Sequence, residues 1–180
     1  MKINMDKGYI QIYTGNGKGK TTCAVGQGIR ACGCGFKVLM IQFLKSWHTG
    51  EIDIVKNIDK FDFMRIGSPR DFTWNLTEDE KTNLKSEITN KFKGLTEIFK
   101  ENKYDMIILD EVLGTINDKF LSEEDVIDFL HKKPETVEVI LTGRNASDNL
   151  INEADLVTEM KEVKHYFAKE VEARRGIEFY

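Results

Sequence analysis

Residues 14–21 read Thr14-Gly15-Asn16-Gly17-Lys18-Gly19-Lys20-Thr21, and this glycine-rich stretch decides the fold. Before it, residues 8–13 alternate and include β-branched and aromatic side chains, which predicts a strand. After it, residues 21–31 carry small and apolar side chains at helical spacing. A strand, a glycine-rich turn and a helix in this order are typical of a phosphate-binding loop, because the positive end of the helix dipole then faces the anion.

The loop chemistry favours a nucleoside triphosphate, with ATP as the expected ligand. Glycines let backbone N–H groups turn inward, Lys20 adds a point charge, and the Thr21 hydroxyl suits a magnesium ion. The usual pattern is G-x-x-x-x-G-K-[ST], whereas here Thr14 stands at the first glycine and two glycines are added inside. The triphosphate can therefore follow a different path from that in ordinary NTPases; the alternative is a glycine-rich turn without a ligand. The predicted nucleotide site comprises Gly15, Asn16, Gly17, Lys18, Gly19, Lys20, Thr21 and Thr22.

The rest of the chain alternates strand and helix patterns. Further strands are expected at residues 36–43, 58–66, 104–109, 137–141 and 156–159, and helices at residues 80–100, 122–132 and 147–153. The runs at 36–43 and 104–109 are continuously apolar, as in strands buried on both faces of a parallel sheet. We therefore predict one three-layer α/β domain over residues 1–180, with a mostly parallel sheet of about six strands.

Composition narrows the possible partners. The chain has 180 residues, 41% of them hydrophobic, which is enough for one packed core. A net charge of −4 argues against nucleic acid as a partner. No run reaches membrane-spanning length and the N-terminus lacks the apolar core of a signal peptide, so we expect a cytoplasmic protein without a membrane partner. The cysteines, Cys23, Cys32 and Cys34, are interpreted as free, small buried residues on and after the first helix.

An acidic pair, Asp110-Glu111, follows a buried strand. Ligands bind at the carboxyl edge of open α/β sheets, and a carboxylate there can hold Mg²⁺ directly or through water. We therefore predict a magnesium site made by Thr21, Glu111 and Asp110, with Glu111 the favoured carboxylate. The alternative interpretation is a solvated strand end.

The loop and several later blocks together resemble the ATP:corrinoid adenosyltransferases of the cobalamin pathway. Residues 13–22 are similar to the signature loop of that family. The likeness continues, in the family's order, at residues 41–45, 50–51, 72–74, 109–111, 139–145, 154–160, 163–165 and 173–178. These blocks span nearly the whole chain.

The resemblance implies a RecA-like P-loop fold, a homodimer and a specific reaction. In this family the 5′-deoxyadenosyl group of Mg-ATP is transferred to the Co(I) centre of a corrinoid and triphosphate is released, with ATP bound in the reverse sense from hydrolases. Co(I) is itself the nucleophile, and stabilising the leaving triphosphate is the electrostatic task, which falls to Lys20 and the loop. Reduction of Co(II) implies an electron donor such as a flavoprotein.

The resemblance also implies an aromatic pair, Phe72 and Trp74, that takes the lower-ligand position of the corrinoid. Their spacing of two would put both on one face of an extended segment, although aromatics at that spacing are ordinarily core residues. Two departures from the family bear on which corrinoid fits: Asp71 replaces a frequent glycine, and residues 112–115 replace a more polar stretch.

Two other functions remain open at this stage. The first is a P-loop ATPase or kinase with γ-phosphoryl chemistry, in which Arg144 would stabilise charge. The second is a non-catalytic, ATP-dependent corrinoid carrier or sensor. The reaction products distinguish these from an adenosyltransferase. The sequence assigns no role to His48 or His165.

Overall fold

The computed structural model describes residues 5–45, 48–67 and 73–178. Its strands are β1 (Ile10–Thr14), β2 (Val38–Phe43), β3 (Phe61–Ile66), β4 (Met106–Asp110), β5 (Glu138–Thr142) and β6 (Leu156–Glu159). Its α-helices are α1 (Lys20–Gly33), α2 (Gly50–Val55), α3 (Glu78–Gly94), α4 (Glu97–Lys100), α5 (Val112–Asn117), α6 (Glu123–His131) and α7 (Asp148–Glu153). Two short 3-10 helices, η1 (Thr73–Asn75) and η2 (Tyr166–Lys169), complete the elements.

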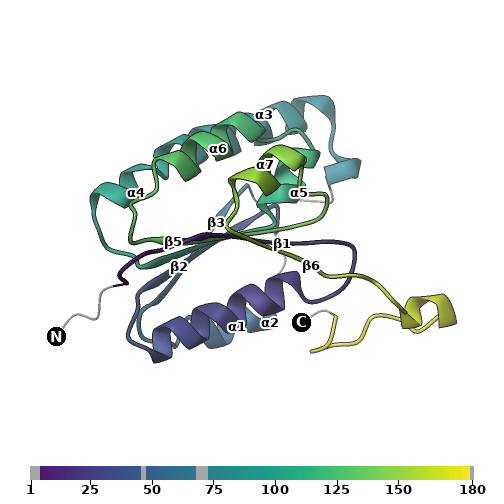
Figure 1. Cartoon of the computed structure of the whole chain (residues 1–180). Helices are drawn as coiled ribbons and strands as arrows, with labels where there is room; N and C mark the ends of the chain where they lie inside the picture. The colour runs from purple at the N-terminus through teal and green to yellow at the C-terminus, as the bar shows by residue number, and fades with distance from the viewer. Residues whose placement is uncertain (1–4, 46–47, 68–72, 179–180) are drawn as a thin grey trace.

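The strands form one sheet in the order β3-β2-β4-β5-β1-β6, and every pairing is parallel. Helices α1 and α2 cover one face, and α3 to α7 cover the other (Figure 1). Each face has its own apolar core, and the central strands β2, β4 and β5 are buried along their whole length. The predicted three-layer α/β fold with six strands is confirmed.

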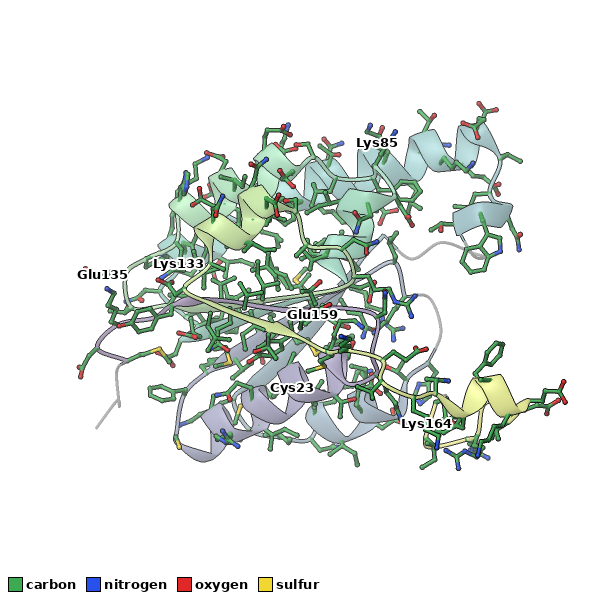
Figure 2. The ribbon with its side chains drawn as sticks, turned by 45° about the vertical axis from the view of Figure 1, so that its right-hand side comes forward. Cys23, Lys85, Lys133, Glu135, Glu159 and Lys164 are labelled. Carbon is green, nitrogen blue, oxygen red and sulfur yellow. The ribbon has the colours of Figure 1, made fainter. Side chains whose placement is uncertain are left out.

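Strand register brings polar strand ends to one edge of the sheet. Gln42 pairs with Asp110 across β2 and β4, and Tyr13 pairs with Thr142 across β1 and β5. The loop after β1 and the acidic end of β4 thus meet at the carboxyl edge, with β5 between their strands. Figure 2 labels Glu159 at this end of β6, and Lys133 and Glu135 at the opposite end of the sheet.

Two predicted helices begin directly after the serine residues that cap them, but one other predicted helix differs from the structure. Ser122 caps α6 and Ser147 caps α7 through their side chains. The helix predicted at residues 80–100 is instead two helices, α3 and α4. At the junction, Leu95 N–H bonds to Phe92 O at 2.9 Å, three residues back, so the α-helical ladder tightens into a turn after Gly94. Helices α2 and α5 were not predicted. Neither has a side-chain cap hydrogen bond at its start, whereas α7, which is equally short and was predicted, is capped by Ser147.

The prediction that the cysteines are buried is wrong for two of the three. Cys23 and Cys34 are exposed, and Cys32 is half-buried; all are free thiols. Helix α1 packs on the sheet through Ala24, Val25, Gly28 and Ala31; Cys23 lies off that face, whereas Cys32 packs partly against the same core. In the described part of the chain, no helix is both long and apolar enough to span a bilayer.

Candidate nucleotide and metal site

The glycine-rich loop leads directly into α1. Gly19 has a left-handed backbone (φ 117°) and precedes the first helical residue, Lys20. The first helical hydrogen bond runs from Cys23 N–H to Gly19 O at 2.7 Å. The N–H groups of Lys20, Thr21 and Thr22 therefore lie at the helix start without helical partners, where they and the helix dipole form an anion site.

The Lys20 side chain folds back across the loop. Its ammonium donates to the carbonyl oxygens of Gly15 at 2.7 Å and Gly17 at 2.8 Å. Burial and the nearby Arg144 lower the pKa of Lys20, while Glu111 acts in the opposite direction. Among the described residues, this half-buried ammonium donates to neutral carbonyls alone and has a guanidinium nearby, so added negative charge would be favourable there.

The extra glycines of the loop are explained by Met160, the residue directly after β6. Gly17 N–H donates to Met160 O at 2.6 Å, and Met160 N–H donates to Thr14 O at 2.8 Å. A Cβ at Gly15 or Gly17 would lie 2.5 or 2.6 Å from the same Met160 oxygen. These two glycines therefore permit close backbone contact with Met160, and the Gly17 N–H is used within the protein.

Asp110 is the polar centre of the site and is fully buried. Its Oδ1 accepts hydrogen bonds of 2.7 Å from both Thr21 Oγ1 and Thr142 Oγ1. Its Oδ2 accepts from Lys45 Nζ at 2.9 Å and from Gln42 Nε2 at 3.1 Å. Four side chains, from α1, β5, β2 and the segment just after β2, thus converge on one carboxylate.

The charge of Asp110 is stabilised by these partners. Burial alone would raise the pKa of Asp110, but the Lys45 ammonium and the hydrogen bonds from Lys45, Thr21 and Gln42 outweigh it and hold the pKa below its usual value. The carboxylate is therefore ionised at neutral pH.

Glu111 lies beside this centre in a strained position. It has a left-handed backbone (φ 65°), precedes α5, and donates its N–H to Thr142 Oγ1 at 2.9 Å. Its carboxylate bends back over Gly114, where a Cβ would lie 2.6 Å from Oε1. Burial, followed by the charge of Asp110, raises the pKa of Glu111, and Lys45, Lys20 and Arg144 lessen that effect. A cation between the two carboxylates would relieve their repulsion.

The donors at this edge fit a magnesium ion completed by other ligands. Among the described residues, no group of three or more His, Cys, Asp or Glu side chains could hold a metal alone. Thr21, Asp110 and Glu111 supply oxygen atoms only, which Mg²⁺ prefers, and Mg²⁺ in nucleotide sites takes one or two carboxylates together with phosphate oxygens and water. The buried, ionised Asp110 is the observation that supports this fit.

Trp74 is not a core residue. Its side chain is 73% exposed, at η1 rather than in the extended segment that we predicted. It borders a cleft of about 520 Å³ between the start of α3 and the end of α5. The cleft is lined by Thr73, Trp74, Glu78, Lys81, Thr82, Lys85, Asp118, Lys119 and Phe120; Lys85 is labelled on α3 in Figure 2. Phe72, the other predicted aromatic, lies outside the described residues.

The remaining predicted residues lie around the loop with other contacts. Asn16 and Thr22 are exposed, and Lys18 donates to Ile177 O at 3.0 Å. His48 contacts Asp53 at 2.8 Å, and His165 accepts a hydrogen bond from Phe167 N–H at 3.0 Å. Neither histidine is part of the Asp110 network.

Sequence reasoning missed three partners of Asp110, namely Lys45, Gln42 and Thr142. Each lies near or just after the carboxyl end of a buried strand, and that signal was available in the sequence. Their meeting at one carboxylate depends on strand order, which the sequence did not provide. Arg144, which the sequence suggested only for a γ-phosphoryl reaction, also lies at this edge, since its charge acts on Lys20 and Glu111 and Ala146, two residues further on, donates its N–H to Thr14 Oγ1 at 3.3 Å.

Comparison with solved structures supports the fold class. The crystal structure of the flagellar accessory protein FlaH from Methanocaldococcus jannaschii superposes with a TM-score of 0.54 and 12% sequence identity, covering 87% of this chain and 72% of that one. At this identity the likeness concerns the fold alone. Together with the loop, it defines a P-loop α/β protein.

Sequence comparison identifies the family. The profile described as ATP:corrinoid adenosyltransferase BtuR/CobO/CobP matches residues 6–179. The corrinoid adenosyltransferase of Escherichia coli K12 is 35% identical over 97% of this chain and 87% of its own length. CobA of Salmonella typhimurium LT2 is 34% identical with the same coverage, and the Sinorhizobium enzyme is 33% identical over 97% and 81%. The chain belongs to the ATP:corrinoid adenosyltransferase family, which confirms the resemblance and makes the protein an enzyme.

Proposed function

We propose that this enzyme transfers the 5′-deoxyadenosyl group of Mg-ATP to the Co(I) centre of a corrinoid and releases inorganic triphosphate. The cobalt electron pair attacks C5′ of ATP, a Co–C bond forms, and the C5′–O bond breaks with its electrons passing to the triphosphate. The observation that carries the proposal is the buried Asp110 bonded to Thr21 directly behind the phosphate loop, in a chain of this family.

The proposed task of the loop residues is to stabilise the leaving triphosphate. Lys20 and the N–H groups at the start of α1 stabilise negative charge that grows as the C5′–O bond breaks. Lys20 is held near that position by two carbonyl oxygens, which it can exchange for phosphate oxygens without a large movement. Each such contact is worth about 2.7–4 kcal/mol of transition-state stabilisation, by analogy with single oxyanion donors.

Magnesium is assigned to Thr21, Asp110 and Glu111 together with phosphate oxygens, and when bound it supplies further positive charge to the triphosphate. Asp110 keeps the Thr21 hydroxyl proton directed toward its own Oδ1, so the lone pairs of Thr21 Oγ1 face outward. Glu111 adds a second carboxylate whose raised pKa falls when a cation approaches.

The corrinoid is assigned to the exposed aromatic surface at Trp74. An indole face that is 73% exposed can cover the lower face of a corrin ring and exclude an axial ligand. A four-coordinate Co(II) centre is easier to reduce, so Trp74 would assist reduction by the electron donor. We propose that this donor is a flavoprotein. Phe72 is assigned to the same surface on the family resemblance.

We also propose a homodimer working in the cytoplasm. Val163, Phe167 and Ile177 in the C-terminal segment are 88%, 77% and 54% exposed, which suits a surface that a second copy covers. The three free thiols suit a reducing compartment.

The deciding experiment incubates the protein with Mg²⁺, ATP and a chemically reduced Co(I) corrinoid. Absorbance follows the light-sensitive Co–C product, and triphosphate is measured in parallel. The two should form in equal amounts, and Lys20→Met should lower the rate about 10²–10³-fold, as for loss of an oxyanion donor. ADP with phosphate as products would favour a γ-phosphoryl enzyme, and binding without a Co–C product would favour a carrier.

A further inference from the structure

Lys45 is the one charged partner of Asp110 within the described residues, and it lies where a metal would bind. Its ammonium is 2.9 Å from Asp110 Oδ2 and 3.4 Å from Thr21 Oγ1. These are the two side chains assigned to magnesium. The Lys45 side chain is 24% exposed, so a path to solvent exists on one side of the pair.

A fully buried carboxylate needs a countercharge, and Asp110 has this one. Thr21, Thr142 and Gln42 donate neutral hydrogen bonds and do not cancel its charge. In the protein without nucleotide, Lys45 therefore neutralises Asp110. A divalent cation bound to the same hydroxyl and carboxylate would supply that charge itself and would repel the ammonium.

We propose that Lys45 is a placeholder cation for the metal site, which leaves the Thr21–Asp110 pair when Mg²⁺ binds there. This inference rests on the magnesium site of the proposed function. It adds an exchange step, in which one Lys45–Asp110 ion pair breaks for each metal bound. Lys45 supplies the countercharge of the ligand-free site, and it sets the Mg²⁺ concentration at which the site fills.

The exchange has a direct consequence for metal affinity. Removing the competing ammonium should tighten Mg²⁺ binding, although it also removes a stabilising contact from the ligand-free protein. A residue that only stabilises the fold would lower stability without changing the Mg²⁺ dependence. A residue that holds phosphate would weaken nucleotide binding at saturating Mg²⁺. The three roles therefore differ in measurable ways.

The experiment compares wild type with Lys45→Met, Lys45→Arg and Lys56→Met. Met removes the charge at similar length, and Arg retains it. Lys56, exposed at the end of α2, is the control for losing one positive charge elsewhere. Thermal unfolding is followed in EDTA and across a Mg²⁺ titration without nucleotide. The Mg²⁺ dependence of ATP binding is then measured by calorimetry.

Lys45→Met is expected to unfold at a lower temperature than wild type in EDTA. Its unfolding temperature should rise more than that of wild type when Mg²⁺ is added, and it should bind Mg²⁺ about tenfold more tightly. Lys45→Arg and Lys56→Met should stay within about twofold of wild type. An unchanged Mg²⁺ response in Lys45→Met, or nucleotide binding weakened at saturating Mg²⁺, would overturn the proposal. Absence of ATP binding by wild type would instead refute the proposed function, whereas ATP binding with the same Mg²⁺ dependence in wild type and Lys45→Met would refute only the role of Lys45.

Wild-type protein provides a second test that does not depend on a variant folding. Amine-reactive labelling followed by mass spectrometry reports the accessibility of each lysine. Labelling of Lys45 should increase severalfold on addition of Mg²⁺ with ATP, relative to Lys56 in the same sample. Equal or reduced labelling of Lys45 would contradict its release.

Discussion

The Thr21 hydroxyl donates a 2.7 Å hydrogen bond to the buried Asp110 carboxylate, across 89 residues of sequence. This bond joins the start of α1 to the end of β4 and aligns two oxygen donors at the edge of the sheet. Because Asp110 also accepts from Lys45, Gln42 and Thr142, its carboxylate organises the site more than any single loop residue does.

Asp110→Asn is expected to destabilise the protein by about 2–4 kcal/mol, because the amide cannot accept from all four donors and leaves Lys45 without its buried anion. Urea unfolding in EDTA measures the loss. Asp59→Asn, at an exposed position after α2, is the matched control and should change stability by less than about 0.5 kcal/mol. Equal stability of the two variants would show that the Asp110 network does not support the fold.

Gly17→Ala should disturb the contact between the loop and β6, because its Cβ would meet the Met160 oxygen at 2.6 Å. We expect a loss of about 1–3 kcal/mol in stability, together with weaker ATP binding. Gly26→Ala is the control, since a Cβ there meets nothing within 4 Å. It lies on the exposed side of α1 and should stabilise the helix by up to about 1 kcal/mol. ATP titration calorimetry and urea unfolding check both, and undisturbed ATP binding by Gly17→Ala would contradict the packing argument.

Trp74→Ala should leave the fold and ATP binding intact, because the side chain is 73% exposed. Its stability should lie within about 0.5 kcal/mol of wild type. Adenosylation starting from a Co(II) corrinoid under reductant should slow by about tenfold or more, a barrier increase of roughly 1.4 kcal/mol. The rate from pre-reduced Co(I) should fall less. Full activity from Co(II) would remove the proposed role of Trp74.

Tyr13, the penultimate residue of β1, should make stability fall at high pH. Burial, and then the charges of Cys23 and Glu138, raise the pKa of Tyr13 to about 12. The folded state therefore keeps the phenol proton that the unfolded chain releases above about pH 10. Its contribution to stability is complete below pH 10 and is lost as pH rises toward 12, at up to about 1.4 kcal/mol per pH unit.

Comparison with Tyr13→Phe isolates this effect from other alkaline titrations. The variant loses the 2.6 Å hydrogen bond to Gln11 Oε1 and should be less stable at pH 8. The difference in free energy of unfolding between wild type and Tyr13→Phe, measured in urea, should shrink between pH 10 and 11.5. A constant difference across that range would mean that Tyr13 ionises at an ordinary pH.

Local pattern was sufficient for much of the fold. The strand, glycine-rich loop and helix at residues 8–31, and the continuous apolar runs that became β2 and β4, were predicted because backbone propensity and buried periodicity act over a few residues. The helix at residues 80–100 was predicted as one element because its apolar spacing continues through Leu95. The break after Gly94 arises from local hydrogen bonding that this spacing does not reveal.

The sequence by itself determined that this protein has a phosphate loop, a parallel α/β sheet and an acidic pair at a strand end. Each of these features can be recognised from continuous stretches of the chain. Only the tertiary structure decided which strand ends meet. Lys45, Gln42 and Thr142 contact Asp110 because of the sheet order β3-β2-β4-β5-β1-β6, and Gly15 and Gly17 face Met160 because β6 lies beside β1. Contacts between residues far apart in the chain depend on the packing of whole elements, and local sequence carries no direct signal of that packing.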